Sequence, residues 1–440
     1  MAELAGREYN REILGALFRS PSKLYKAAVA LLFLGIVWGA IVWSYQIYQG
    51  MGVAGISHPV GWGVYIVNFV FWIGIGHAGT LISAILYLFR VRWRPAIHRA
   101  AEAMTVFAVM TAGLFPLIHL GRVWVFYFIL PYPNQRHLWP NFKSPLVWDV
   151  VAVTTYLTIS VIFWFAGMIP DLAAARDSST GRAQRIYRAL ALGWRSEHDQ
   201  WRHYLRGYMA LAALATPLVI SVHSVVSWDF AVSLLPGWHT TIFAPYFVAG
   251  AIHSGLAMVL VLLIPLRRWL RLERIIRIYH LEQTALLMVF IAFIMGYSYL
   301  MEAFTAWYSG DIFERQFALW RAFGPYGWAF WSMILCNVFA PLLFFFKRVR
   351  TNLIWLFGIG LLVVYGMWIE RFVIIINSTA HDFLPHNWGT YNPTWVEISI
   401  SAGALCFFLF FFLLFAKYLP AVSIVENKEA QMAEAVEAAL

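Results

Sequence analysis

Residues 62–89 read WGVYIVNFVFWIGIGHAGTLISAILYLF and contain no Asp, Glu, Lys or Arg. A helix of about 20 apolar residues crosses the hydrocarbon core of a membrane, which is about 30 Å thick. This stretch is therefore long enough to span a membrane, and similar runs recur along the chain. The sequence predicts about ten transmembrane helices, at residues 26–47, 62–89, 100–130, 146–170, 207–234, 241–266, 281–306, 325–346, 353–376 and 396–418.

The composition favours an all-α, polytopic membrane protein. Of the 440 residues, 61% are hydrophobic and 12% are charged, against about 45–50% and about 25% in soluble domains. The net charge of +10 comes from short basic clusters between the apolar runs, which argues against nucleic-acid binding. Cys336 and Cys406 lie inside apolar runs without metal-ligand spacing. We therefore expect no metal site, iron–sulfur cluster or c-type haem in this chain.

The distribution of Lys and Arg predicts the orientation. If the N-terminus is cytoplasmic, 26 of the 32 Lys and Arg residues lie in or beside cytoplasmic segments, including the terminal segments 1–25 and 419–440. Four lie in the opposite loops, and two, Arg122 and Arg371, lie within predicted spans. Because cytoplasmic loops of membrane proteins carry an excess of positive charge, we expect both termini to be cytoplasmic.

A short internal repeat predicts two related halves. Residues 76–79 read GHAG and residues 252–255 read IHSG, in the middle of the second and sixth predicted spans. Both of these spans run from the outside to the inside. We therefore expect two four-helix bundles, at 62–234 and 241–376, with the first and last spans at the periphery.

Ionisable residues gather at the outer ends of three consecutive predicted spans. An ionisable group inside a membrane helix costs at least about 2.5–3.5 kcal/mol, so it needs a partner, a cavity or a function. His119 and Arg122 lie three residues apart in the third span, which places them on one helical face. Asp149 opens the fourth span and Asp229 closes the fifth. The sequence therefore predicts polar groups from three helices at one depth.

These residue types fit a site for a quinol. Removing two electrons and two protons from a quinol requires a hydrogen-bonding base, an anionic proton acceptor and an aromatic, apolar slot. The alternative is that both aspartates face headgroup water while Arg122 extends outward. His223 and Asp229 are six positions apart, so we expect only one to face a pocket. The predicted catalytic residues are His119, Asp149 and Asp229, and the predicted quinol-binding residues are Arg122, Trp124, Trp148 and His223.

Five other polar residues lie deeper in the predicted spans. His77 and His253 lie near the midplane, where an imidazole serves either as a proton relay or as an interhelical hydrogen bond. Glu302 lies in the seventh span, and the ninth carries Glu370 and Arg371, a candidate ion pair. These five residues are the predicted proton relay.

Three stretches together resemble a known family. They are residues 62–86, residues 116–124 (PLIHLGRVW) and residues 221–230 (SVHSVVSWDF). They resemble the NrfD/PsrC family of membrane subunits, and within it the ActC subunit of alternative complex III, with ActF as the nearest relative to distinguish. The resemblance extends over essentially all ten spans.

The resemblance implies a subunit of the bacterial cytoplasmic membrane that holds no haem or iron–sulfur cluster. It would oxidise menaquinol or another quinol near the periplasmic surface, and it could couple this reaction to proton translocation. The implied partners are c-type haem subunits, a periplasmic iron–sulfur subunit and a second NrfD-like membrane subunit. The implied quinol-site residues are His119, Asp149 and Asp229, and the implied relay positions are His77, His253 and Glu302.

Two other classes of membrane protein remain open. Four intramembrane histidines, His77, His119, His223 and His253, are compatible with a haem-binding cytochrome of the b type, although they fall at mixed depths. Internal repeats and midplane polar groups are also typical of secondary transporters. The main polar cluster of this sequence is instead near one surface, which favours the quinol site.

Overall fold

The computed structural model describes residues 12–129 and 142–427, and this part of the chain is helical throughout, with connecting turns and no strand. Ten of its helices are long and apolar enough to cross a membrane, which confirms the predicted number and the all-α class. They are α2 (Lys23–Gln49), α3 (Gly63–Thr80, continuing to Leu88), α5 (His98–His119), α6 (Pro145–Asp177), α8 (His198–Ala231), α9 (Phe243–Leu270), α10 (Ile278–Tyr308), α12 (Gly327–Ile334, continuing to Phe345), α15 (Leu353–Phe372, continuing to Ala380) and α17 (Trp395–Tyr418).

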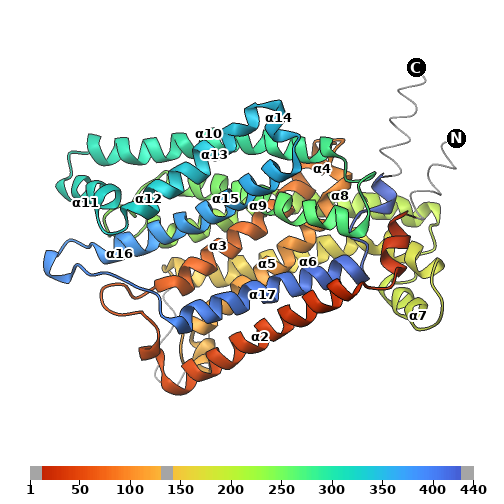
Figure 1. Cartoon of the computed structure of the whole chain (residues 1–440), viewed down its shortest axis with the longest axis horizontal. Helices are drawn as coiled ribbons and strands as arrows, with labels where there is room; N and C mark the ends of the chain where they lie inside the picture. Colours follow the sequence, from red (N-terminus) through yellow and green to blue (C-terminus); the bar gives the residue numbers. More distant parts are fainter. Residues whose placement is uncertain (1–11, 130–141, 428–440) are drawn as a thin grey trace.

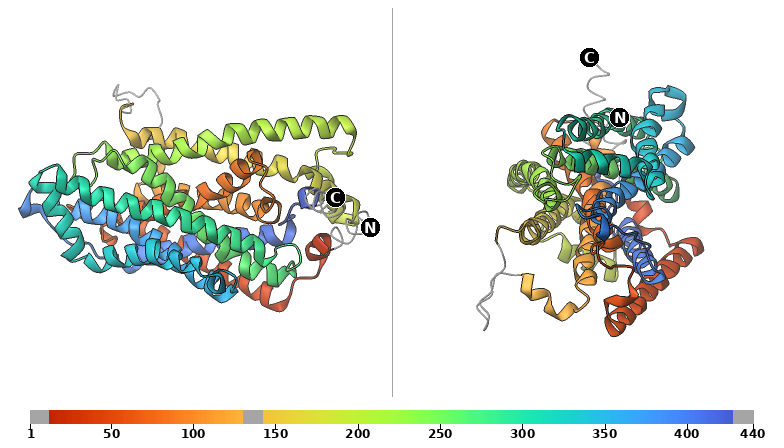
Figure 2. Two further views of the ribbon diagram at one scale, coloured as in Figure 1. Left: turned by 90° about the horizontal axis from the view of Figure 1, so that it is seen from above. Right: turned by 90° about the vertical axis from the view of Figure 1, so that its left-hand side faces the viewer.

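The ten long helices run roughly along one axis (Figures 1 and 2). Helices α3, α5, α6 and α8 pack together, as do α9, α10, α12 and α15. Helix α9 joins the two groups, because it packs against both α3 and α8. Helices α2 and α17 pack against each other along one side of the molecule (Figure 1). The arrangement is thus two four-helix groups with two peripheral helices.

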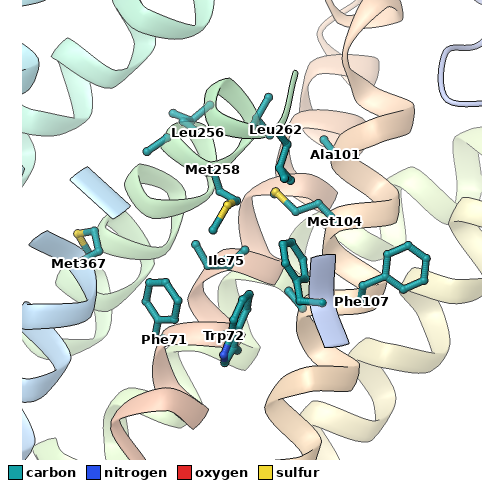
Figure 3. Packing of buried hydrophobic residues seen from close by; sticks show 14 of the residues in the cluster. Phe71, Trp72, Ile75, Ala101, Met104, Phe107, Leu256, Met258, Leu262 and Met367 are labelled. Carbon is teal, nitrogen blue, oxygen red and sulfur yellow. The ribbon is translucent and has the colours of Figure 1, made fainter. Parts of the chain in front are cut away.

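Helix α3 lies at the centre and is buried on nearly all sides. Figure 3 shows its Ile75 in one apolar cluster with Met104 of α5 and Met258 of α9. Two glycines allow this close packing. A Cβ on Gly79 would lie 2.0 Å from the Ala101 carbonyl oxygen of α5, and one on Gly255 of α9 would lie 2.0 Å from the Ala78 Cβ. Residues of the GHAG and IHSG motifs therefore contact each other between the two halves. Small residues commonly allow such close approach of helices in membrane proteins.

We expect Gly79→Ala to destabilise the protein, because the added methyl group meets a backbone oxygen that cannot rotate away. Overpacking of this kind costs about 1–3 kcal/mol. The measurement is the thermal unfolding midpoint of the detergent-purified protein. Gly113→Ala on α5 is the matched control, since a Cβ there meets nothing within 4 Å. Equal midpoints for the two variants would show that the α3–α5 contact is looser than described.

The third span is shorter than the sequence predicted. Helix α5 ends at His119, and Gly121 follows with a φ of +67°. Residues Val123–Ile129 then form a separate 3₁₀ segment. A glycine in the left-handed conformation is a common helix terminator, because it carries no Cβ to clash. The prediction of one helix over 100–130, and with it the placement of His119 and Arg122 on one helical face, is therefore wrong.

A buried ionic network fixes the end of the bundle opposite to His119. The Arg99 guanidinium, 1% exposed, contacts Glu102 at 2.9 Å and Asp171 at 3.3 Å, and it donates to the Gly167 carbonyl at 2.7 Å. Asp171 also accepts hydrogen bonds from the backbone N–H groups of Ile424 (3.0 Å) and Val425. This network therefore ties α5 to α6 and both helices to the segment after α17.

Candidate functional site

Two carboxyl groups lie close together at the ends of α6 and α8 that the distribution of Lys and Arg predicts to be the outer ends. Asp149 lies in the second turn of α6 and is 5% exposed, and Asp229 lies in the last turn of α8. The two carboxyl groups lie close enough to interact electrostatically. Both oxygens of Asp149 and Oδ1 of Asp229 are buried and have no hydrogen-bond partner among the described residues. Neighbouring carboxyl groups in a buried site oppose each other's ionisation, so the pair is suited to take up and release a proton.

Two tryptophans flank the acid pair. Trp148 and Trp228 each precede one of the aspartates, and their rings meet edge to face with centroids 5.9 Å apart. The Trp148 indole N–H donates to the Phe142 carbonyl at 2.6 Å, and both rings are a little over one third exposed. Two partly exposed indole rings, each from the residue next to one of the aspartates, thus pack against each other near the acid pair.

The predicted quinol-site residues at the end of α5 form no hydrogen bond with this pair in the described chain. His119 is the last residue of α5, and its Nδ1 is buried without a partner among the described residues. Beyond the end of the helix, Arg122 is exposed and Trp124 is 62% exposed. The structure thus brings Asp149, Asp229 and Trp148 together, and it turns Arg122 and Trp124 toward the surface.

His223 belongs to a deeper layer. It is fully buried, and its ring lies 4.4 Å from that of His77 on α3, which in turn stacks on Tyr156 of α6 at 4.9 Å. The Tyr156 hydroxyl donates to the Gly76 carbonyl at 2.8 Å. His77 Nε2 and both nitrogens of His223 have no partner in the described residues. His223 and Asp229 therefore face different neighbours, α3 and α6.

A third group of buried polar residues lies across α9. The Arg371 guanidinium lies over the Phe247 ring at 4.4 Å, and Phe247 also contacts His223, with ring centroids 5.8 Å apart. Arg371 contacts Glu370 at 2.7 Å, and Glu370 also accepts a hydrogen bond from Tyr299. Polar and aromatic side chains thus run without interruption from the first helix group into the second.

Two π-helical turns adjoin this third group. One, Leu335–Phe339, contains Asn337, which donates to Glu370 at 3.2 Å. The other, Val373–Asn377, begins two residues after Arg371. Such turns widen a helix and are frequent at functional sites.

His253 on α9 is fully buried and neither ring nitrogen has a partner in the described residues.

A cavity of about 110 Å³ lies at the predicted outer end of the second helix group. Glu302 of α10 and Arg321 of α11 (Ile312–Phe323) form an ion pair in its wall. Glu314, also in the wall, lies 3.5 Å from His239 and accepts the backbone N–H of Gly237 at 3.0 Å. Burial raises the pKa of the Glu314 carboxyl. Acidic groups thus line this cavity together with a cation.

Sequence reasoning missed three polar residues that the structure places in or beside these groups, and it missed Glu102 in the buried network around Arg99. Tyr156 could have been found, because it lies seven residues after Asp149 and thus on the same face of α6. Glu102 could also have been found, since it is a carboxylate inside a predicted span. Tyr299 and Asn337 are ordinary polar residues of apolar helices, and nothing in the sequence distinguishes them.

Comparison with known proteins assigns the family. Residues 52–381 match the sequence profile described as "Polysulphide reductase, NrfD". The chain belongs to the NrfD family. All the acids, histidines and tryptophans of the outer and deeper layers lie inside the region matched to NrfD. The described residues of this NrfD chain contain no group of three or more His, Cys, Asp or Glu side chains suited to a metal.

Three curated relatives match the NrfD chain over different shares of its length. The C subunit, a membrane protein, of a putative dimethyl sulfoxide reductase of Halobacterium salinarum is 27% identical and covers 89% of this chain and 90% of its own. The C subunit of a selenate reductase of Mesobacillus selenatarsenatis is 27% identical over 54% of this chain and 56% of its own. An Hdr-like menaquinol oxidoreductase integral membrane subunit of Archaeoglobus fulgidus is 20% identical over 81% and 80%.

Proposed function

We propose that this chain is the quinol-binding membrane subunit of an electron-transfer complex, and that it oxidises menaquinol at the outer ends of α6 and α8. The observation that carries the proposal is the proximity of Asp149 and Asp229, two carboxyl groups with buried oxygens that have no hydrogen-bond partner among the described residues. The names of the relatives support it, since they are subunits of reductases and one is a menaquinol oxidoreductase.

The mechanism follows from what a quinol must lose. Oxidation to the quinone releases two electrons and two protons, and the ionised member of the acid pair accepts the first proton from a hydroxyl group. The edges of Trp148 and Trp228 border the ring, and His119 Nδ1, which has no partner within the described residues, accepts a hydrogen bond from the second hydroxyl and then takes the second proton. The electrons leave outward to a partner.

The partners in this proposal are those of alternative complex III. They are c-type haem subunits, a periplasmic iron–sulfur subunit and a second NrfD-like membrane subunit, with this chain in the position of ActC. The complex lies in the bacterial cytoplasmic membrane with both termini of this chain inside. In support, Lys417 at the end of α17 donates to the Ala16 carbonyl just before α2, so the first span begins and the last span ends on one side.

The deeper polar residues form the proton relay of the proposal. Tyr156, His77 and His223, whose rings are in contact, form one part of this relay, deeper than the acid pair. Arg371 and Glu370 on the far side of the Phe247 ring form a second part, together with His253, and Glu302 lies in the wall of the cavity of about 110 Å³. Since the acid pair and Glu302 both lie at the predicted outer side, proton translocation in this proposal also requires a connection from the relay to the inner surface.

The rival classes are less well supported by this geometry. The rings of His77 and His223 lie in contact, with no space for a porphyrin between them. The acid pair lies at one membrane surface, whereas transporter sites lie near the midplane.

The test of the function is menaquinol-dependent reduction of an added cytochrome c by the purified native complex. We expect turnover by the unaltered complex, and about tenfold slower turnover for His119→Ala, the effect of losing one hydrogen bond of about 1.4 kcal/mol. Assembly of each complex is confirmed first by the presence of all its subunits. An intact complex that turns over no quinol would overturn the proposal.

A further inference from the structure

A second cavity, of about 250 Å³, lies at the opposite membrane surface from the acid pair. It is bounded by the start of α2, the end of α9 and the end of α17. Ser22 caps the first turn of α2, Arg271 follows the last residue of α9, and Lys417 lies in the last turn of α17. The cavity therefore lies at the depth where these three spans leave the hydrocarbon.

Three cations line this cavity, and no acidic residue is among the side chains that line it. They are Arg19, Arg271 and Lys417. Within residues 12–129 and 142–427, none of the three has an ion pair with a carboxylate. Arg19 lies close enough to Lys417 for the two positive charges to repel each other. An anion in the cavity would relieve this repulsion.

Lys417 is fixed in the wall although it has no acidic partner among the described residues. Its side chain is 7% exposed, and its ammonium group donates to the carbonyl oxygens of Ala16 and Leu17, each at 3.0 Å, and to that of Arg19. These carbonyl groups satisfy the hydrogen bonds of the ammonium group, but they do not neutralise its positive charge. Arg19 and Arg271 are exposed side chains, so their guanidinium groups are able to turn toward a ligand.

The remaining walls of the cavity are apolar and aromatic. Tyr25 and Trp269 lie with ring centroids 5.2 Å apart, and the Tyr25 hydroxyl donates to the Leu413 carbonyl at 3.2 Å. Leu266 and Leu413 complete the wall between α9 and α17. A free inorganic anion would gain nothing from these surfaces, whereas the glycerol and upper acyl segments of a phospholipid would bury against them.

We propose that this cavity binds the phosphate headgroup of an anionic phospholipid, held by Arg19 and Arg271 beside the fixed charge of Lys417, with its acyl chains along α2 and α9. Basic pockets between transmembrane helices on the cytoplasmic side recognise such headgroups. The lipid would join the peripheral α2–α17 pair to α9 of the second helix group. The proposal does not depend on quinol chemistry.

The test uses the full-length chain in nanodiscs, with bound lipid counted by native mass spectrometry. One lipid composition is phosphatidylcholine alone, and the other contains about one tenth phosphatidylglycerol. Each Arg near an anionic headgroup contributes about fivefold in affinity. We therefore expect the double variant Arg19→Gln, Arg271→Gln to bind phosphatidylglycerol about 30-fold more weakly than the unaltered protein.

Two variants and one further ligand make the result decisive. Arg268→Gln, an exposed arginine on the same helix outside the cavity, should bind lipid as the unaltered protein does. The double variant Arg19→Lys, Arg271→Lys keeps both positive charges, so it should retain most of the affinity for phosphatidylglycerol. It provides the test if the Gln variant does not fold. Equal phosphatidylglycerol binding by the Gln variant, or equal stabilisation of the unaltered protein by inorganic phosphate in phosphatidylcholine, would overturn the proposal.

Discussion

Asp149→Asn is expected to slow menaquinol oxidation by at least about 100-fold, since general acid–base groups contribute about 10²–10⁴ in rate. The amide cannot take a proton from the quinol hydroxyl, and it removes the charge that Asp229 shares. Asp229→Asn should have a similar effect. The double variant should be no slower than the slower single variant, because residues that act as a unit are not additive.

The measurement is the steady-state rate of menaquinol-dependent cytochrome c reduction by assembled complexes. Asp177→Asn is the matched control, since this acid lies at the other end of α6 and is 66% exposed. Its rate should equal that of the unaltered complex. If the effects of Asp149→Asn and Asp229→Asn multiply in the double variant, the two acids act separately, and the proposal that they act as one proton-accepting pair is wrong.

Arg99→Ala is expected to lower the stability of the chain by about 3–5 kcal/mol, the usual effect of removing one partner of a buried ion pair. The truncation leaves Glu102 and Asp171 buried without their cation, and it removes a donor from the Gly167 carbonyl. The loosened Asp171 would also release the segment at 424–425. The measurement is the midpoint of denaturant unfolding in a fixed detergent.

The loss of stability in Arg99→Ala should depend on the lost charge and not only on the lost side-chain volume. Adding Glu102→Gln and Asp171→Asn to Arg99→Ala should recover part of the stability, because the uncompensated charges are gone. Arg182→Ala, an exposed arginine on α7 (Gly181–Leu190), is the control and should change stability by less than about 0.5 kcal/mol. A triple variant less stable than Arg99→Ala would show that the network stabilises through its hydrogen bonds instead.

The sequence by itself determined the ten spans and the helical class. Each span is a local property, because about 20 apolar residues bury their backbone polar groups only as a helix in lipid. The end of α5 was also a local signal that the prediction overlooked, since Gly121 stands two residues after His119. The GHAG and IHSG motifs indicated an internal repeat, but not that Gly255 meets Ala78.

Only the tertiary structure decided which polar groups meet. From the sequence, Asp149 and Asp229 could equally well be helix-end residues facing water, and their proximity depends on the rotation of α6 and α8 about their own axes. The same rotations turn His223 toward His77. A periodic apolar pattern fixes which face of a helix is buried, yet in a helix buried on several sides it does not fix which neighbour each face meets.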